Sequence, residues 1–143
     1  MPADPIPGLS RSDPLSAVSP IDGRYAGRTA PLSPYASEAG LMRARTRVEV
    51  EYLIELAALD ETPLAFDEPT VDALCDLYES FAAEDARLIK ALEVEGAAGY
   101  AATNHDVKAV EYFLRVRLSE AADGDGPVDH AEAVIPWIHF GLT

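Results

Sequence analysis

The sequence predicts an all-α fold, on three observations. Apolar residues recur every three or four positions in several separate segments, no segment alternates apolar and polar residues as a half-buried strand does, and neither an internal repeat nor a coiled-coil heptad occurs. The chain has 143 residues, of which 48% are hydrophobic, and this is enough to bury one core. We therefore expect a single helical domain.

The amino-terminal part of the chain predicts little regular structure. Residues 1–14 contain four prolines and few groups to bury, so we expect a disordered tail there. Residues 15–34 follow as a loop with turn-forming Ser-Pro and Asp-Gly pairs. Arg24 and Tyr25 stand in the middle of this loop, which makes it a candidate binding element.

A first helix is expected from about Ser37 to just before Thr62-Pro63. The apolar residues that recur along one predicted face are Leu41, Ala44, Val48, Tyr52, Leu56 and Leu59. The charged residues between them are Arg43, Arg45, Arg47, Glu49, Glu51 and Glu55. We expect these charged side chains to be solvated, with weak pairing between residues four apart.

A second helical region is expected from about Pro69, a favourable first-turn proline, through Phe81 and on toward Leu92. Its predicted core stripe consists of Val71, Leu74, Cys75, Tyr78, Phe81, Leu88 and Leu92. The Gly/Ala-rich residues 96–102 interrupt this pattern, and we expect a flexible connection there.

A third helix is expected from about Asp106 to Glu120, with Asn104 or Asp106 as its cap. Its predicted buried residues are Val107, Val110, Phe113, Leu114 and Leu118. After a turn at 123–127, a last amphipathic segment begins at His130.

Charge and composition exclude several classes of function. The 25 acidic and 11 basic residues give a net charge of -14, so we expect neither nucleic-acid nor membrane binding, both of which need clustered Lys and Arg. The acidity fits equally a salt-adapted protein and an acidic protein from a GC-rich genome. Cys75 is the only cysteine, so no intrachain disulfide can form and a reducing cytoplasm is indicated. The three histidines lack metal-binding spacing, so we expect no metal.

The stretch from Thr103 to Tyr112 is the most informative part of the chain, because it places polar side chains at the start of an amphipathic helix. A helix start attracts phosphate or carboxylate groups, and a histidine there can move protons near neutral pH. Local chemistry alone leaves open whether His105 belongs to a ligand site or is a surface residue beside a helix cap. It likewise leaves open whether Arg24 binds a phosphate or pairs with one of the many acids.

Three segments, taken together and in order, resemble the adenylosuccinate lyase family, of the fumarase/aspartase superfamily. They are LSAVSPIDGRY at 15–25, TNHDVKAVEYFL at 103–114 and IHFGLT at 138–143. The resemblance covers the chain from about residue 15 to its end. It implies a domain at 15–143 that is the small helical N-terminal domain of the fumarase/aspartase-type fold, truncated at the start of the central bundle domain.

The resemblance also implies a reaction and a set of site residues. Members of the family eliminate fumarate from adenylosuccinate, giving AMP, and from the succinylated aminoimidazole carboxamide ribotide of purine synthesis; they need no metal or organic cofactor and act as homotetramers. His105 is implied as an auxiliary catalytic group at most. By motif, the residues that bind the nucleotide substrate are Arg24, Tyr25, Asn104, His105, Asp106 and Thr143.

The chain also departs from the family pattern. Residues 95–102 add a Gly/Ala-rich insert before the Asn-His-Asp motif. After Thr143 the family continues with a Ser-Glu-Asp helix, the segment with the catalytic histidine, the loop with the catalytic base, and the central helical bundle. We therefore expect the 143-residue chain to be inactive by itself.

Two other readings stay open. One is a sister lyase, such as one of the argininosuccinate lyase type, although the Arg24-Tyr25 and Asn-His-Asp motifs favour a nucleotide substrate. The other is a helical protein-interaction or regulatory module that uses its charged helix to bind protein.

Overall fold

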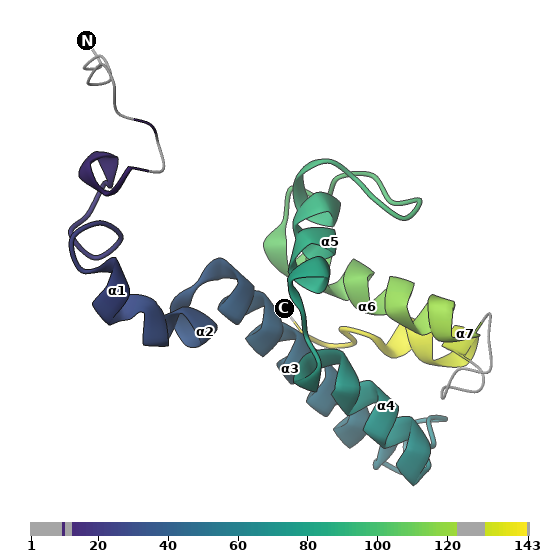
Figure 1. Cartoon of the computed structure of the whole chain (residues 1–143). Coiled ribbons are helices and arrows are strands. Elements are labelled where there is room, and N and C mark those ends of the chain that lie inside the picture. The colour runs from purple at the N-terminus through teal and green to yellow at the C-terminus, as the bar shows by residue number, and fades with distance from the viewer. Residues whose placement is uncertain (1–9, 11–12, 123–130, 143) are drawn as a thin grey trace. The chain divides into compact units, whose positions relative to one another are not determined.

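The computed structural model describes residues 10, 13–122 and 131–142. The chain divides into two compact units, Met1–Gly40 and Leu41–Thr143, and each is described by itself. Every regular element among these residues is helical and no strand occurs among them, which confirms the all-α prediction (Figure 1). Most of the predicted tail at 1–14, namely 1–9 and 11–12, lies outside the described residues.

The elements follow one another along the chain as short helical turns, then longer helices, then short turns again. In order they are η1 (Pro14–Ser16), α1 (Ala26–Thr29), η2 (Ala30–Leu32), α2 (Ser33–Ala36), α3 (Glu38–Ala57), α4 (Glu68–Glu79), α5 (Ala83–Val94), α6 (Asp106–Ala122), α7 (Ala131–Val134) and η3 (Ile135–Trp137). Among the described residues, no helix is long and apolar enough to cross a membrane.

The first unit contains more helix than the predicted loop at 15–34, because α1, η2 and α2 lie largely within it. Gly23 explains how this segment folds back on itself: a Cβ at that position would lie 2.8 Å from the Pro14 carbonyl oxygen and 2.8 Å from the Ala17 Cβ. The backbone at Gly23 therefore lies closer to Pro14 and Ala17 than a residue with a Cβ would permit. Arg24 follows directly.

Helix α3 buries only part of the predicted stripe, in which Leu56 is buried and Tyr52 is partly buried. Leu41, Val48 and Leu59 are 47%, 61% and 50% exposed. The residues of α3 that are buried are Met42, Thr46, Glu49, Val50, Leu53 and Leu56. Both sets recur at helical spacing, so the helices that pack on α3 decide which side faces the core.

The charged residues of α3 are solvated only in part, as the exposed Arg43, Arg47 and Glu55 show. Arg47 pairs with Glu51 four residues on, at 3.5 Å, as the spacing predicts. The Arg43 Nε–H donates to the Tyr78 carbonyl oxygen at 2.8 Å, and the Tyr78 hydroxyl donates to Glu51 Oε1 at 2.9 Å. Glu49 is only 6% exposed. Arg43, Glu49 and Glu51 thus also make polar contacts between α3 and the rest of the second unit.

The single helical region predicted from Pro69 onward is two helices, α4 and α5. Asp67 caps α4 by accepting the Thr70 backbone N–H at 3.0 Å, and Pro69 occupies its first turn as predicted. The chain leaves the helical conformation before Ala82, where φ is -117° and ψ is 176°. Asp85 Oδ2 then accepts the Ala82 backbone N–H at 2.8 Å and starts α5.

The segment between α5 and α6 forms a tight, hydrogen-bonded turn. Ala97 and Tyr100 exchange two backbone hydrogen bonds, while Ala98 and Gly99 both have positive φ, as in a two-residue hairpin turn. The Tyr100 ring packs on Tyr112 of α6 with the ring centroids 4.3 Å apart. The Gly/Ala-rich insert is thus anchored on α6.

Helix α6 is the centre of the core, and it lies beside α5 (Figure 1). The edge of the Phe81 ring packs on Phe113 at 6.2 Å between centroids. Val107, predicted to be buried, is half-buried at the start of the helix. The predicted residues Val110, Phe113, Leu114 and Leu118 are all buried, together with Leu53 of α3, Leu74 and Tyr78 of α4, and Ile89 and Leu92 of α5.

Candidate functional site

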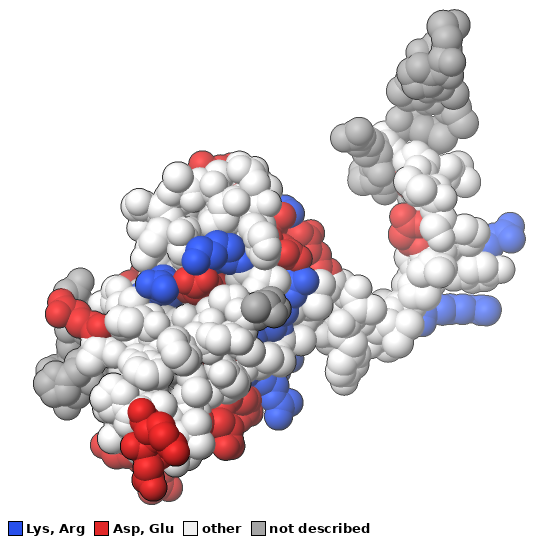
Figure 2. All heavy atoms as spheres, turned by 180° about the vertical axis from the view of Figure 1, so that it is seen from behind, with Lys and Arg blue, Asp and Glu red and all other residues white. Residues whose placement is uncertain are grey.

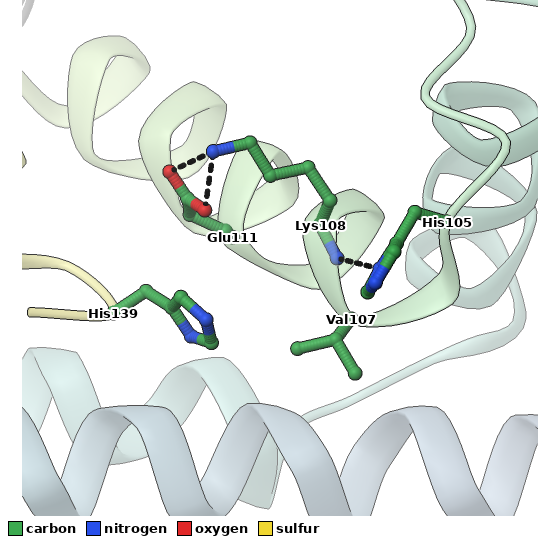
Figure 3. A pocket seen from close by; sticks show the side chains of 5 residues that line it. All are labelled: His105, Val107, Lys108, Glu111 and His139. Atoms are coloured by element: carbon green, nitrogen blue, oxygen red, sulfur yellow. Dashed lines mark hydrogen bonds and ion pairs between the residues drawn. The ribbon is translucent and has the colours of Figure 1, made fainter. Parts of the chain in front are cut away.

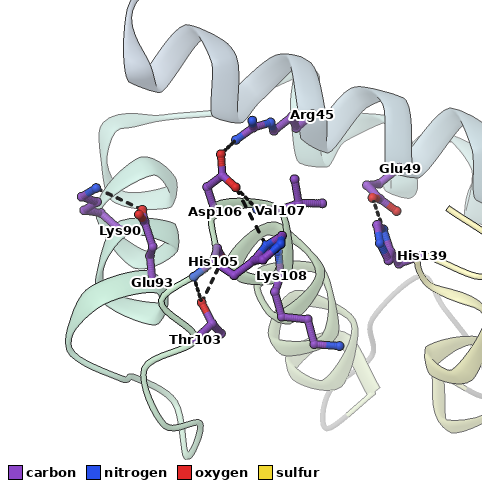
Figure 4. A network of polar contacts seen from close by, with 10 residues as sticks. All are labelled: Arg45, Glu49, Lys90, Glu93, Thr103, His105, Asp106, Val107, Lys108 and His139. Atoms are coloured by element: carbon purple, nitrogen blue, oxygen red, sulfur yellow. Dashed lines mark hydrogen bonds and ion pairs between the residues drawn. The ribbon is translucent and has the colours of Figure 1, made fainter. Parts of the chain in front are cut away.

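His105 is the N-cap residue of α6, where the sequence predicts Asn104 or Asp106. Its carbonyl oxygen accepts the Ala109 N–H at 3.0 Å, which is the first hydrogen bond of the helix. Its Nδ1 accepts the backbone N–H of Lys108 at 3.2 Å, as a capping side chain does (Figure 4). Because Nδ1 is an acceptor in this contact, a neutral His105 carries its hydrogen on Nε2.

The residues before His105 are fixed by backbone contacts to the end of α5. The Thr103 N–H donates to the Leu92 carbonyl at 3.0 Å, and the Asn104 N–H donates to the Glu93 carbonyl at 2.8 Å. Asn104 adopts a left-handed conformation with φ of 49°, which asparagine tolerates better than most residues. This conformation turns the chain from the end of α5 into α6.

Asp106 joins the start of α6 to α3. Its Oδ2 lies 2.6 Å from Arg45 Nη1, and its Oδ1 accepts the Val107 backbone N–H at 2.9 Å. The hydrogen bond from Arg45, followed by the one from Val107, holds the pKa of the Asp106 carboxyl below its usual value. The side chain is half exposed, so this pair adds modestly to stability.

His139 comes from the last turn of the second unit, where the chain passes close to α3 again. Its backbone is left-handed with φ of 62°, and Gly141 follows with φ of 73°. The His139 Nδ1 lies 2.6 Å from Oε1 of the buried Glu49 (Figure 4). The folded chain thus brings this histidine to the same part of the molecule as His105.

The two histidines line one pocket. Its volume is about 340 Å³, which is at the lower end for a small-molecule site. Figure 3 shows His139 on one side, His105 on the other, and the first turn of α6 between them. The lining residues are His105, Val107, Lys108, Glu111 and His139.

The charged groups in the pocket are held in place by hydrogen bonds and ion pairs. Glu111 is 3% exposed, and its carboxylate accepts hydrogen bonds from the Lys108 Nζ at 2.8 Å and the Arg115 Nε at 3.0 Å. The Lys108 ammonium also lies 5.1 Å from the centre of the Tyr112 ring. The pocket therefore combines a helix N-terminus, an ammonium group paired with the Glu111 carboxylate, and two imidazoles, a set that suits a polar ligand.

Arg24 and Tyr25 belong to the first unit. Both are exposed, and the Arg28 guanidinium lies 5.8 Å from the centre of the Tyr25 ring. A hydrogen bond from the Tyr25 N–H to the Pro20 carbonyl at 2.8 Å closes the turn that precedes α1. The prediction that Arg24 and Tyr25 act together with His105 stays a prediction.

The sequence predicts only part of this pocket. Of the expected site residues within the described range, His105 lines it, whereas Asn104 and Asp106 are not among its lining residues; Thr143 lies outside the described range. Sequence reasoning missed Lys108, Glu111 and His139. The only signal for them was their position inside the two segments 103–114 and 138–143, which carry the resemblance.

The surface does not offer a continuous basic patch on the face shown in Figure 2, where Lys and Arg side chains lie beside Asp and Glu. The basic residues that pair with acids include Arg45 with Asp106, Lys108 with Glu111 and Arg117 with Asp85. Within the part of the chain that the structure describes, no group of three or more His, Cys, Asp and Glu residues could hold a metal ion.

Comparison with known proteins gives a consistent result. No family model matches the chain. The adenylosuccinate lyase of Dictyostelium discoideum is 42% identical over 132 residues, the enzyme of that name from Escherichia coli strain K12 is 41% identical over 132, and that of Legionella pneumophila strain Corby is 39% identical over 131. Each match covers 90% of this chain and 26% of the relative. The chain thus spans about a quarter of the length of these relatives.

Proposed function

The chain belongs to the adenylosuccinate lyase family, and we propose that it supplies part of the nucleotide-binding site of an enzyme that eliminates fumarate from adenylosuccinate to give AMP. The same site would act on the succinylated aminoimidazole carboxamide ribotide. We place this enzyme in the cytoplasm as a homotetramer that needs no metal or organic cofactor.

The observation that supports this proposal most directly is the pocket at the start of α6. Two family segments that are far apart in sequence, 103–114 and 138–143, each contribute a histidine to it. The positive groups at the pocket are the start of α6 and Lys108, which is paired with Glu111, in a chain with a net charge of -14. This is the local environment that a phosphate or carboxylate of a nucleotide substrate requires.

We propose that the residues of this chain that bind the nucleotide substrate are Arg24, Tyr25, Asn104, His105, Asp106 and Thr143. Of these, His105 lines the pocket at the start of α6. Arginine fits a phosphate because its planar guanidinium forms two parallel hydrogen bonds to the oxygens. Asp106 would act mainly by holding the helix start in place, since its two oxygens already bind Arg45 and the Val107 N–H.

The chain's contribution is binding rather than complete catalysis. Elimination needs one group to remove a proton beside a carboxylate and another to protonate the leaving nitrogen, each worth roughly 10² to 10⁴ in rate. His105 could fill at most one of these roles. We expect no fumarate release when the purified chain is incubated with adenylosuccinate, and measurable release would contradict this division of labour.

Calorimetric titration of the chain with AMP and with adenylosuccinate tests the binding. We expect saturable binding that Arg24→Ala and His105→Ala each weaken about tenfold or more, which corresponds to the loss of one charge-assisted hydrogen bond. The matched control is Arg87→Ala, which removes an exposed arginine of α5 that does not line the pocket. An unchanged helical circular dichroism spectrum excludes unfolding as the cause. A folded chain that binds neither nucleotide would favour the helical interaction module.

A further inference from the structure

The contact between Glu49 and His139 is unusual for a protein interior. Glu49 lies on α3 and is 6% exposed, and its Oε1 is 2.6 Å from the His139 Nδ1. Its second oxygen, Oε2, is buried and has no hydrogen-bond partner among the described residues. Arg45, the basic residue one turn earlier on α3, pairs instead with Asp106 at 2.6 Å. Among the described residues, His139 is thus the hydrogen-bond partner of the buried carboxylate.

Stability does not account for this arrangement. A buried carboxylate loses its hydration, and a single contact that leaves one oxygen unsatisfied replaces only part of it. An apolar side chain of similar size would pack at Glu49 without that cost. His139 adds a second unfavourable feature, because its φ of 62° lies in the left-handed region. Strained backbone and unsatisfied buried groups of this kind concentrate at functional sites.

The contact determines how His139 faces the pocket. With Glu49 as a carboxylate, which can only accept, the hydrogen in the contact lies on the His139 Nδ1. The Nε2 edge of the ring is then turned toward the pocket, on the side of His105 and Val107 (Figure 3). His105 is held in the opposite way, because its Nδ1 accepts the Lys108 N–H. In its neutral form, His139 presents an Nε2 acceptor to the pocket. The neutral His105 presents an Nε2–H donor.

We propose that Glu49 is a positioning residue: it fixes the tautomer and the orientation of His139, so that the two histidines of the pocket present complementary hydrogen-bonding groups to the ligand. The relevance to the ligand rests on the proposed function of the pocket. The effect on His139 itself does not, because it is a property of the chain without ligand.

Nitrogen-15 NMR of the histidine rings in the ligand-free chain tests this directly, because a ring nitrogen that carries hydrogen resonates far from one that does not. We expect the His139 Nδ1 to carry hydrogen whether the ring is neutral or protonated, and the neutral His105 to carry its hydrogen on Nε2. In Glu49→Ala, His139 should lose this pattern and shift toward the Nε2–H tautomer that imidazole prefers in water. His105 should not change.

Two further variants keep the test decisive. Glu49→Leu replaces the carboxylate by an apolar group of similar size that neither accepts nor donates, so we expect His139 to lose the Nδ1–H pattern there even if Glu49→Ala does not fold. Glu51→Gln changes a neighbouring carboxylate of α3 that binds the Tyr78 hydroxyl, and it should leave His139 unaltered. An unchanged His139 pattern in folded Glu49→Leu would overturn the proposal. Absence of AMP binding alongside a changed pattern would overturn the nucleotide site and leave the role of Glu49 standing.

Discussion

His105 has two separable roles, as the cap of α6 and as a side chain of the pocket, and substitutions can divide them. His105→Ala removes the acceptor for the Lys108 backbone N–H together with the imidazole. His105→Asn also removes the imidazole, but it restores a capping side chain, because asparagine is among the most favourable N-cap residues. The two variants therefore differ in the cap and agree in the loss of the ring.

The geometry of the cap sets the loss of stability expected in His105→Ala. Loss of an N-cap costs about 0.5 to 2 kcal/mol. The contact here is long for a hydrogen bond, at 3.2 Å, and the His105 side chain is 64% exposed, so water replaces part of what is lost. We expect His105→Ala to lower the free energy of unfolding by about 0.5 to 1 kcal/mol. His105→Asn should be as stable as the original chain or slightly more stable.

Urea unfolding followed by far-ultraviolet circular dichroism measures the stability of the three proteins, and calorimetry measures their affinity for AMP. We expect His105→Asn to be more stable than His105→Ala, while both variants bind AMP about tenfold or more weakly than the original chain. Equal destabilisation by alanine and asparagine would refute the capping role. Undiminished AMP affinity in His105→Asn would refute a role for the imidazole in binding.

Three further predictions concern the framework around the pocket. Arg45 lowers the pKa of the Asp106 carboxyl. The ionised carboxyl therefore stabilises the fold at pH values above the ordinary carboxyl pKa, and this stabilisation is lost as the pH falls through the lowered pKa. Since the side chain is half exposed, we expect Asp106→Asn to lower the free energy of unfolding by about 0.5 kcal/mol at neutral pH. Unfolding free energies measured against pH should show this difference shrinking in acid, and a difference that stays constant would contradict it. Phe113→Ala should cost about 3 to 5 kcal/mol in urea unfolding, because the ring is 0% exposed; a loss below about 1 kcal/mol would mean that the core closes over the cavity. Gly96→Ala places a Cβ 2.8 Å from the Tyr100 carbonyl oxygen at a φ of +87°, so thermal unfolding should show a loss of about 1 to 3 kcal/mol, and an unchanged transition would show that the turn can adjust.

The sequence predicts the framework of this protein better than its polar contacts. Periodicity alone identifies α6, and four of its five predicted core residues are buried. Periodicity is only partly right on α3, where Leu56 is buried as predicted but Leu41 and Val48, which follow the same period, are exposed. Apolar residues lie on more than one side of that helix, and the period gives the spacing of a face without saying which face meets the core.

The break between α4 and α5 shows a related limit. The apolar period continues across residues 80–82, so it predicts one helical region there. The interruption depends on Asp85 accepting the backbone N–H of Ala82, and an aspartate within a helical pattern is no clear signal of a start. In the same way, the sequence marks a cap before α6 but assigns it to the wrong residue, because histidine is a less frequent N-cap than asparagine or aspartate.

By itself, the sequence determined the helical class, the location of α6, and the family segments that contain His105 and His139. Only the tertiary structure decided that these histidines share a pocket, that Glu49 is buried against one of them, and that Arg45 holds Asp106. The physical reason is the range of the interactions. Helix formation depends on neighbours within a few residues, whereas a buried carboxylate is stabilised by whichever donor the folded chain brings to it.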